Sequence, residues 1–141
     1  MSHQVNRYLK DKAMDYIDHA LGRPVDPLIE SHRNHFAVDA GSKTAKEFDA
    51  SPFWDRYGKA APGGMAFYRV NAEGRKALKR YLKEIGDKHR IYDVTYRGQT
   101  QSVVAVSAAK AKYSLWLDIS DSFCDLTFGT FCRAATVRKA V

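Results

Sequence analysis

The chain contains little cysteine and no long apolar run, and these absences narrow the classes of protein to which it can belong. Its 141 residues include two cysteines, Cys124 and Cys132, which are too few for a disulfide scaffold or a zinc module. No run approaches the roughly 18 apolar residues that a membrane helix needs, and the N-terminal residues lack the apolar core of a signal peptide. We therefore expect a cytoplasmic protein with no membrane partner, in which both cysteines are small apolar core residues.

Recognisable catalytic motifs are also missing. The sequence has no Gly-x-Ser-x-Gly nucleophile elbow and no His-Glu-x-x-His arrangement, and Gly63-Gly64 is not followed by the Gly-Lys-Ser/Thr of a phosphate loop. We therefore expect a protein that is not an enzyme, with no catalytic residues and no cofactor.

Two groups of polar residues have some of the chemistry of a metal site. His32 and His35 lie three residues apart, with Glu30 and Asp39 nearby, but the sequence offers no third ligand. A second group, near the C-terminus, lacks the glycine-anchored spacing of a calcium loop: Asp118, Asp121 and Asp125. We interpret the histidines as helix-packing residues and the aspartates as a solvated surface, and expect no metal.

The composition that remains is that of a folded, basic protein. Hydrophobic residues make up 45% of the chain and aromatic residues 12%, which is enough to bury a core. Lysine and arginine total 23 against 16 acidic residues, a formal net charge of +7. This charge favours an anionic partner, such as nucleic acid or an acidic protein face. The alternative, that the charge only keeps the protein soluble, stays open.

Helical spacing dominates the first third of the chain. Apolar residues from Val5 to Ala20 recur at spacings of three and four and predict a helix over 4–21, ended by Gly22. Charged residues fill its other face: Lys10, Asp11, Lys12, Asp15 and Asp18. Asp26-Pro27 predicts the start of a second helix, which would run through Phe36. Residues 44–59 are expected to form two short helical pieces, because Pro52 interrupts their pattern.

A strand followed directly by a helix is predicted in the middle of the chain. Met65 to Val70 has the composition of a strand, Asn71 is a suitable helix N-cap, and Gly86 ends the helix. The buried stripe of this helix is expected to contain Ala77, Leu78, Tyr81, Leu82 and Ile85.

The last third predicts a β-hairpin. Ile91 to Tyr96 and Gln99 to Val106 read as strands, and Arg97-Gly98 is the turn between them. Three further elements are expected: a helix capped by Ser107 that runs to Ile119, a short helix capped by Thr127, and a strand over 136–141. Tyr96 and Arg97 at the hairpin tip are candidate partner contacts.

The helix after Asn71 is strongly basic. Together with Arg69 of the preceding strand, it predicts a positive binding face: Arg69, Arg75, Lys76, Lys79, Arg80 and Lys83. Such a face suits contacts with phosphates or with an acidic protein patch. The alternative is the ordinary solvated side of an amphipathic helix.

One stretch of the chain resembles the wing strand and last helix of winged-helix proteins: Phe67-Tyr68-Arg69-Val70-Asn71-Ala72-Glu73-Gly74-Arg75-Lys76-Ala77-Leu78. An aromatic-x-Val/Leu-Thr-x-x-Gly-Arg-x-Ala-Leu pattern is common there, and Asn71 replaces its usual threonine. The resemblance extends loosely over residues 5–85. It would place a recognition helix within 44–59, where basic and acidic residues balance. We therefore expect a degenerate winged helix that serves as a protein-binding scaffold rather than reading the major groove.

Two further stretches resemble small uncharacterised proteins of tailed phages and prophages: Arg33-Asn34-His35-Phe36, and the segment from Tyr92 through Tyr113. This resemblance implies a non-enzymatic accessory protein in the host cytoplasm. Its partner would be a host protein or protein–nucleic-acid complex, such as a nucleic-acid-handling or anti-phage defence complex, in the manner of an anti-CRISPR protein. Direct contact with nucleic acid stays open, as does the alternative of a winged-helix DNA-binding transcriptional regulator.

The predicted fold class is α+β. Residues 1–86 would form a helical, winged-helix-like half, and residues 87–141 a β-hairpin followed by two helices and a strand. Because no linker separates them, we expect the halves to pack as one compact body.

Overall fold

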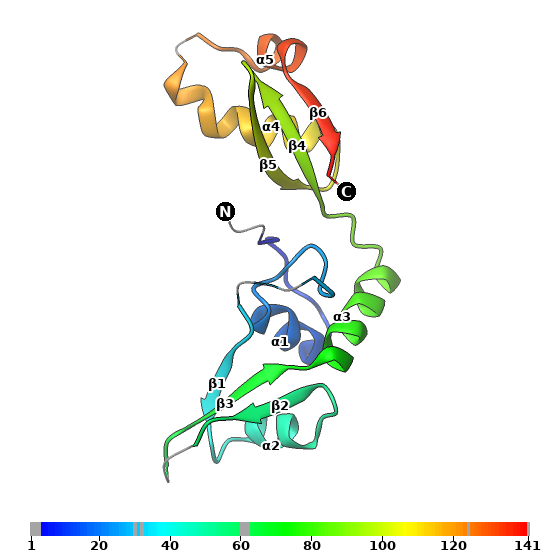
Figure 1. Ribbon diagram of the computed structural model, residues 1–141, viewed down its shortest axis with the longest axis vertical. Coiled ribbons are helices and arrows are strands. Elements are labelled where there is room, and N and C mark those ends of the chain that lie inside the picture. The colour runs from blue at the N-terminus through cyan, green and yellow to red at the C-terminus, as the bar shows by residue number, and fades with distance from the viewer. Residues whose placement is uncertain (1–3, 30, 32, 60–62, 124, 141) are drawn as a thin grey trace. The chain divides into compact units, whose positions relative to one another are not determined.

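The computed structural model describes residues 4–29, 31, 33–59, 63–123 and 125–140. The chain is α+β, as predicted, and divides into two compact units (Figure 1). The N-terminal unit takes in Asn6–Asp87, and the C-terminal unit takes in the described residues from Lys88 onward together with Gln4 and Val5. Among the residues described, no helix has both the length and the apolar character needed to cross a bilayer. Packing of the two units as one body stays a prediction.

The N-terminal unit is built around a three-stranded antiparallel sheet. Its elements are α1 Lys12–Ala20, β1 Phe36–Asp39, α2 Lys43–Ala50, β2 Trp54–Tyr57, β3 Met65–Val70 and α3 Ala72–Glu84. The strand order is β1-β3-β2, so β3 is the central strand. Tyr68 of β3 lies opposite Phe36 of β1, and Val70 lies opposite Trp54 of β2.

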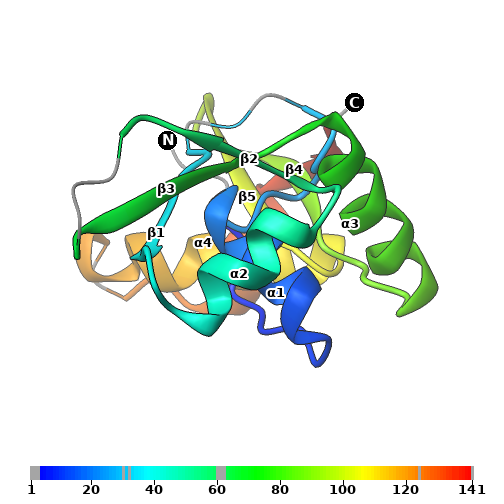
Figure 2. The same cartoon turned by 90° about the horizontal axis from the view of Figure 1, so that it is seen from below.

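All three helices of this unit contribute to a core on one face of the sheet. Side chains alternate between the two faces of a strand, and Ala66, Tyr68 and Val70 of β3 are the buried set. They pack with residues from every helix: Ile17, Leu21, Phe48, Leu78 and Leu82. Figure 2 shows α1 and α2 on the same side of β2 and β3. The opposite face, which carries Phe67 and Arg69, is therefore the outward face of this sheet.

The first predicted helix is shorter than expected. It begins at Lys12 because the Asp11 side chain caps it, accepting a hydrogen bond from the Met14 backbone N–H at 3.1 Å. Residues 4–9 form no regular secondary structure. Asp18, expected on the solvated face, is instead fully buried, because two arginine side chains pair with it. The predicted end of the helix is confirmed, since Gly22 has a φ of +78°.

Two other helix predictions in this unit are wrong. Asp26-Pro27 opens a turn in which the Asp26 carboxylate accepts from the Leu28 backbone N–H at 3.0 Å, and Phe36 begins β1 rather than ending a helix. Of the two short helices expected over 44–59, the first is α2, but the second is the strand β2. At Phe36 and over β2, pairing with β3 overrides local helical spacing.

The predicted strand–helix corner is confirmed. Asn71 caps α3 by accepting from the Gly74 backbone N–H at 3.0 Å, and Gly86 follows the helix with a φ of +72°. A Cβ at Gly74 would lie 2.6 Å from Val70 Cγ1 and 2.7 Å from the Phe53 carbonyl oxygen. Glycine at this position therefore lets α3 approach the preceding segment closely. In the predicted stripe Ala77, Leu78 and Leu82 are buried, Tyr81 is half-buried and Ile85 is half exposed.

The C-terminal unit is a second three-stranded antiparallel sheet with helices. Its elements are β4 Arg90–Tyr96, β5 Gln99–Ala105, α4 Ala108–Ile119, the 3-10 turn η1 Ser120–Ser122, α5 Phe128–Ala134 and β6 Thr136–Lys139. The order is β5-β4-β6, which confirms the predicted hairpin, both helices and the last strand. Arg97 and Gly98 have φ values of +52° and +76°, the backbone that a two-residue type I′ hairpin requires.

Local hydrogen bonds and an apolar core define this unit. The side chains of Ser107 and Thr127 cap α4 and α5, as predicted, each accepting from the backbone N–H three residues later. Leu115 of α4 and Phe131 of α5 are buried and pack with Val94 of the central strand β4. The helices are thus fixed by contacts within a few residues and by one apolar cluster.

Candidate binding surface

The cations of α3 divide into two groups, and the first is used within the N-terminal unit. Arg75 Nη1 donates to the carbonyl oxygens of Pro27 and Ile29 at 2.9 and 3.1 Å. Lys79 Nζ contacts both carboxylate oxygens of Asp26 at 3.2 Å. These two side chains hold the loop of residues 26–29 beside the helix, so they are not free for a partner.

The second group is directed away from the unit. Lys76, Arg80 and Lys83 are exposed and lie within about 60° of one another around a helix that turns 100° per residue. Lys76 pairs with Glu73 at 3.6 Å, but both side chains are more than 60% exposed, so the pair contributes little. No carboxylate in the described part of the chain pairs with Arg80 or Lys83. We call these three residues the α3 cation cluster.

The loop beside α3 exposes aliphatic side chains. Leu28 is 49% exposed and Ile29 is 65% exposed. Because Arg75 binds the Ile29 carbonyl oxygen directly, these side chains adjoin the basic helix. The surface therefore combines cations with aliphatic groups.

Arg69 occupies a different part of the predicted basic face. It lies on the outward face of the sheet, and its guanidinium stands 4.1 Å above the centre of the Tyr57 ring. Its direct neighbour is therefore an aromatic ring rather than another cation of the predicted face.

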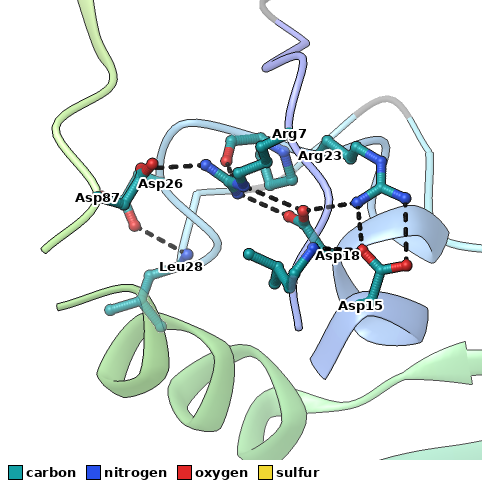
Figure 3. Close-up of polar contacts among 9 residues, drawn as sticks. Arg7, Asp15, Asp18, Arg23, Asp26, Leu28 and Asp87 are labelled. Atoms are coloured by element: carbon teal, nitrogen blue, oxygen red, sulfur yellow. Dashed lines mark hydrogen bonds and ion pairs between the residues drawn. The ribbon is translucent and has the colours of Figure 1, made fainter. Parts of the chain in front are cut away.

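A buried ion network holds the irregular N-terminal segment (Figure 3). Arg7 Nη2 lies 2.6 Å from Asp18 Oδ1, and Arg23 Nη1 lies 3.1 Å from Asp18 Oδ2. Two further carboxylates complete the network, with Asp87 3.2 Å from Arg7 and Asp15 2.7 Å from Arg23. Asp18 is fully buried between two cations, so loss of any one of these charges would leave another buried without a partner, and the network offers no contact to a binding partner.

At the edge of this network, burial and neighbouring charges shift the pKa values of three side chains, Asp15, His19 and Arg23. Burial raises the pKa of Asp15, but hydrogen bonds from Arg23 and from the Leu9 backbone outweigh it, so the pKa lies below 3.8. Burial lowers the pKa of Arg23. The hydrogen bond to Asp15 and the negative charges of Asp15 and Asp18 together outweigh burial, so the pKa is raised. The pKa of His19 is below 6.5 because of burial and of the cations Arg33 and Arg23.

The hairpin tip is less open than expected. Tyr96 is half-buried, with its ring 4.9 Å from that of Phe131 and 6.0 Å from that of Phe123. Arg97 is exposed and stands 4.8 Å above the Phe123 ring. A shallow cavity of about 170 Å³ lies between this tip and α4. Tyr96 thus belongs to the packing of the unit, and Arg97 is its exposed cation.

Only some of the residues considered as metal ligands are among those that the structure describes. Glu30, His32 and Cys124 lie outside the described residues, and His35 Nδ1 is hydrogen-bonded to the Tyr57 hydroxyl. Among the residues that the structure covers, no three His, Cys, Asp or Glu side chains are placed to hold a metal ion. Asp118, Asp121 and Asp125 are exposed, and Cys132 is a half-buried free thiol.

Comparison of the chain with protein-family models, with curated proteins and with solved structures found no match. The case for function therefore rests on surface geometry.

Proposed function

We propose that this protein is a non-enzymatic accessory protein that binds an acidic surface of a host macromolecular complex. The observation that carries the proposal is the α3 cation cluster next to the exposed side chains of Leu28 and Ile29. The sequence resemblance to phage and prophage proteins suggests the setting, which is a nucleic-acid-handling or anti-phage defence complex of the host.

The mixture of charge and aliphatic surface favours a protein partner. Cations without carboxylate partners attract an acidic patch and speed the encounter with it. Leu28 and Ile29 would gain apolar contacts on a protein, and apolar groups occupy the centre of many protein interfaces. Phosphates and sugars offer no such contacts.

The scaffold we propose is a degenerate winged helix. The order β1-β3-β2 and the final helix α3 are consistent with it. One helix, α2, lies between β1 and β2 in the described residues, and its cations Lys43 and Lys46 are balanced by Glu47 and Asp49. A neutral helix at this position is poorly suited to reading DNA.

Charge reversal of the α3 cation cluster tests the proposal. The variant Lys76→Glu/Arg80→Glu/Lys83→Glu should lose its partner in affinity capture from a bacterial host lysate analysed by mass spectrometry. The matched control reverses three exposed lysines elsewhere, Lys10, Lys43 and Lys46, and changes the net charge equally. Both variants should keep the unfolding midpoint of the parent protein. Unchanged capture by the α3 variant would overturn the assigned surface.

The second candidate is a winged-helix DNA-binding regulator. It is favoured by the exposed Arg69 on β3, the strand that pairs with β2 as the two strands of a wing would. A gel-shift titration separates the candidates: tight duplex binding with a steep salt dependence supports the regulator. Weak, sequence-blind binding supports the protein-binding function.

A further inference from the structure

The outward face of the N-terminal sheet gathers aromatic rings. The His35 ring stacks on Phe67 with centroids 5.7 Å apart and planes 26° from parallel. The Tyr57 ring lies 6.1 Å from Phe67 and 6.0 Å from His35, to which its hydroxyl is hydrogen-bonded, and Arg69 covers Tyr57. We call His35, Tyr57, Phe67 and Arg69 the aromatic platform.

Backbone pairing sets the positions of these rings. Phe67 of the central strand lies opposite Tyr57 of β2 and opposite Ala37 of β1. Just before β1, the Asn34 amide bonds to the N–H and carbonyl of Val70, at 2.7 and 2.9 Å. These bonds fix the chain next to His35, so the platform is largely preorganised.

The core of the unit is complete without the platform. Other aromatic side chains fill the inward face, and they pack among themselves: Tyr16, Phe36, Phe48, Trp54 and Tyr68. The platform rings belong to the opposite face, where His35 and Arg69 are exposed and Tyr57 and Phe67 are half-buried. Because His35 stacks on Phe67 and Arg69 covers Tyr57, the planar groups open to a flat ligand are the exposed His35 ring and Arg69 guanidinium.

We propose that the aromatic platform binds a short stretch of single-stranded nucleic acid. Unstacked bases would stack on the exposed His35 ring and Arg69 guanidinium, which lie over Phe67 and Tyr57, in the way that aromatic side chains on other sheet surfaces receive bases. The bases of a duplex are already stacked on one another and cannot reach a flat sheet, so duplexes bind less well.

The charges around the platform fit an anionic strand with few phosphate contacts. Arg69 and the nearby Lys59 are exposed, and neither pairs with a carboxylate within the described ranges. Asp39 and Asp55 lie on the same face and offset these two cations, Asp55 directly opposite Arg69 in the strand pairing, where it accepts a hydrogen bond from Asn71 at 3.3 Å. These carboxylates limit the number of phosphate contacts. Two phosphate contacts to a single strand predict a shallow salt dependence, with a log–log slope of about −1.4.

This inference does not depend on the proposed function, because the α3 cation cluster shares no residue with the platform. Fluorescence anisotropy with labelled dT12, rU12 and a 12-base-pair duplex tests it. We expect both single strands to bind more tightly than the duplex, and the preferred single strand identifies the sugar. Phe67→Leu keeps an apolar side chain but removes the ring on which His35 stacks, so it should weaken binding about tenfold.

Two more variants separate stacking from charge and from misfolding. Arg69→Lys keeps the charge but loses the planar group, and we expect a several-fold loss of affinity. Lys10→Gln/Lys110→Gln, at exposed lysines outside both the platform and the α3 cation cluster, should leave single-strand binding unchanged. The unfolding midpoints of Phe67→Leu and Arg69→Lys verify that the unit remains folded.

Three results with oligonucleotides would overturn the inference. They are an absence of single-strand binding by the parent protein at low salt, equal binding of duplex and single strand, and unchanged binding by folded Phe67→Leu. Phe67-dependent binding of an acidic peptide in place of either oligonucleotide would assign the platform to a protein ligand and would also overturn it.

Discussion

The two units have similar architectures but different interiors. Each has a three-stranded antiparallel sheet with helices, yet the buried charged residues belong to the N-terminal unit alone among the residues described: Arg7, Asp18 and Arg23. The C-terminal unit buries an apolar cluster that includes Leu115 and Phe131. Residues 4–9, the irregular segment before α1, have no strand or helix hydrogen bonds and are held by ion pairs. The C-terminal unit is held by helix N-caps, a tight hairpin turn and apolar packing.

The sheets also differ in how far apart in sequence their paired strands lie. In the C-terminal unit β4 and β5 are joined by the two-residue turn Arg97-Gly98. In the N-terminal unit Phe36 pairs with Tyr68 across a helix and another strand. Closing such loops costs entropy that only tertiary contacts repay, so we expect substitutions at long-range contacts to affect the N-terminal unit most.

Removal of the central carboxylate should have the largest effect. Asp18→Asn leaves two buried guanidinium groups without their shared anion, so the N-terminal unit should lose about 3–5 kcal/mol of unfolding free energy. Urea unfolding read by Trp54, in a Trp116→Phe background, measures this loss. The exposed Asp118→Asn is the control and should be neutral. A loss below about 1 kcal/mol would show that the ion network is not the main support of the segment.

The two helical glycines should respond in opposite directions. Gly74→Ala places a Cβ against Val70 and the Phe53 carbonyl, and we expect a loss of about 1–3 kcal/mol. Gly129→Ala in α5 meets only Arg133 Nη1 at 3.6 Å and should gain about 0.5 kcal/mol from helix propensity. Thermal unfolding of both variants provides the measurement. A similar change of the same sign in both would contradict the close approach at Gly74.

Glycines with left-handed backbone should behave alike in both units. Gly86 and Gly98 have φ values of +72° and +76°, and an added Cβ would meet nothing within 4 Å at either. Each change to alanine should therefore cost about 1 kcal/mol through backbone strain alone. Urea unfolding of the two variants tests this equality. A much larger cost at one glycine would reveal a tertiary role for that turn.

Acidification should produce the smallest effect, and it should begin in the N-terminal unit. The pKa of His19 lies below 6.5 in the folded protein, so the unfolded chain binds the proton more readily and stability falls as the pH drops below 6.5. Because the pKa of Asp15 is lowered, its carboxylate adds stability at pH values above its ordinary pKa of 3.8, and this stability is lost at more acidic pH. Urea midpoints read by Trp54 at about pH 7 and about pH 5 measure the first effect. His19→Gln should reduce this difference; an unchanged difference would place the titrating group elsewhere.

The candidate surface was only partly predictable. The sequence identified the basic residues of α3, and Lys76, Arg80 and Lys83 are indeed exposed. It did not predict that Arg75 binds a loop 48 residues away, because helical periodicity describes a single helix and not its neighbours. The aromatic platform was missed for the same reason: His35 was assigned to a helix, and Tyr57 was not assigned to a strand.

The sequence by itself determined the α+β class, the β3–α3 corner and nearly all of the C-terminal unit. In those regions the deciding interactions span few residues, as in the caps at Asn71, Ser107 and Thr127 and the turn at Arg97-Gly98. Only the tertiary structure decided that β1 and β2 are strands and that Asp18 is buried. Those outcomes depend on tertiary contacts, with β3 for the two strands and with the Arg7 and Arg23 guanidinium groups for Asp18, which helical periodicity does not encode.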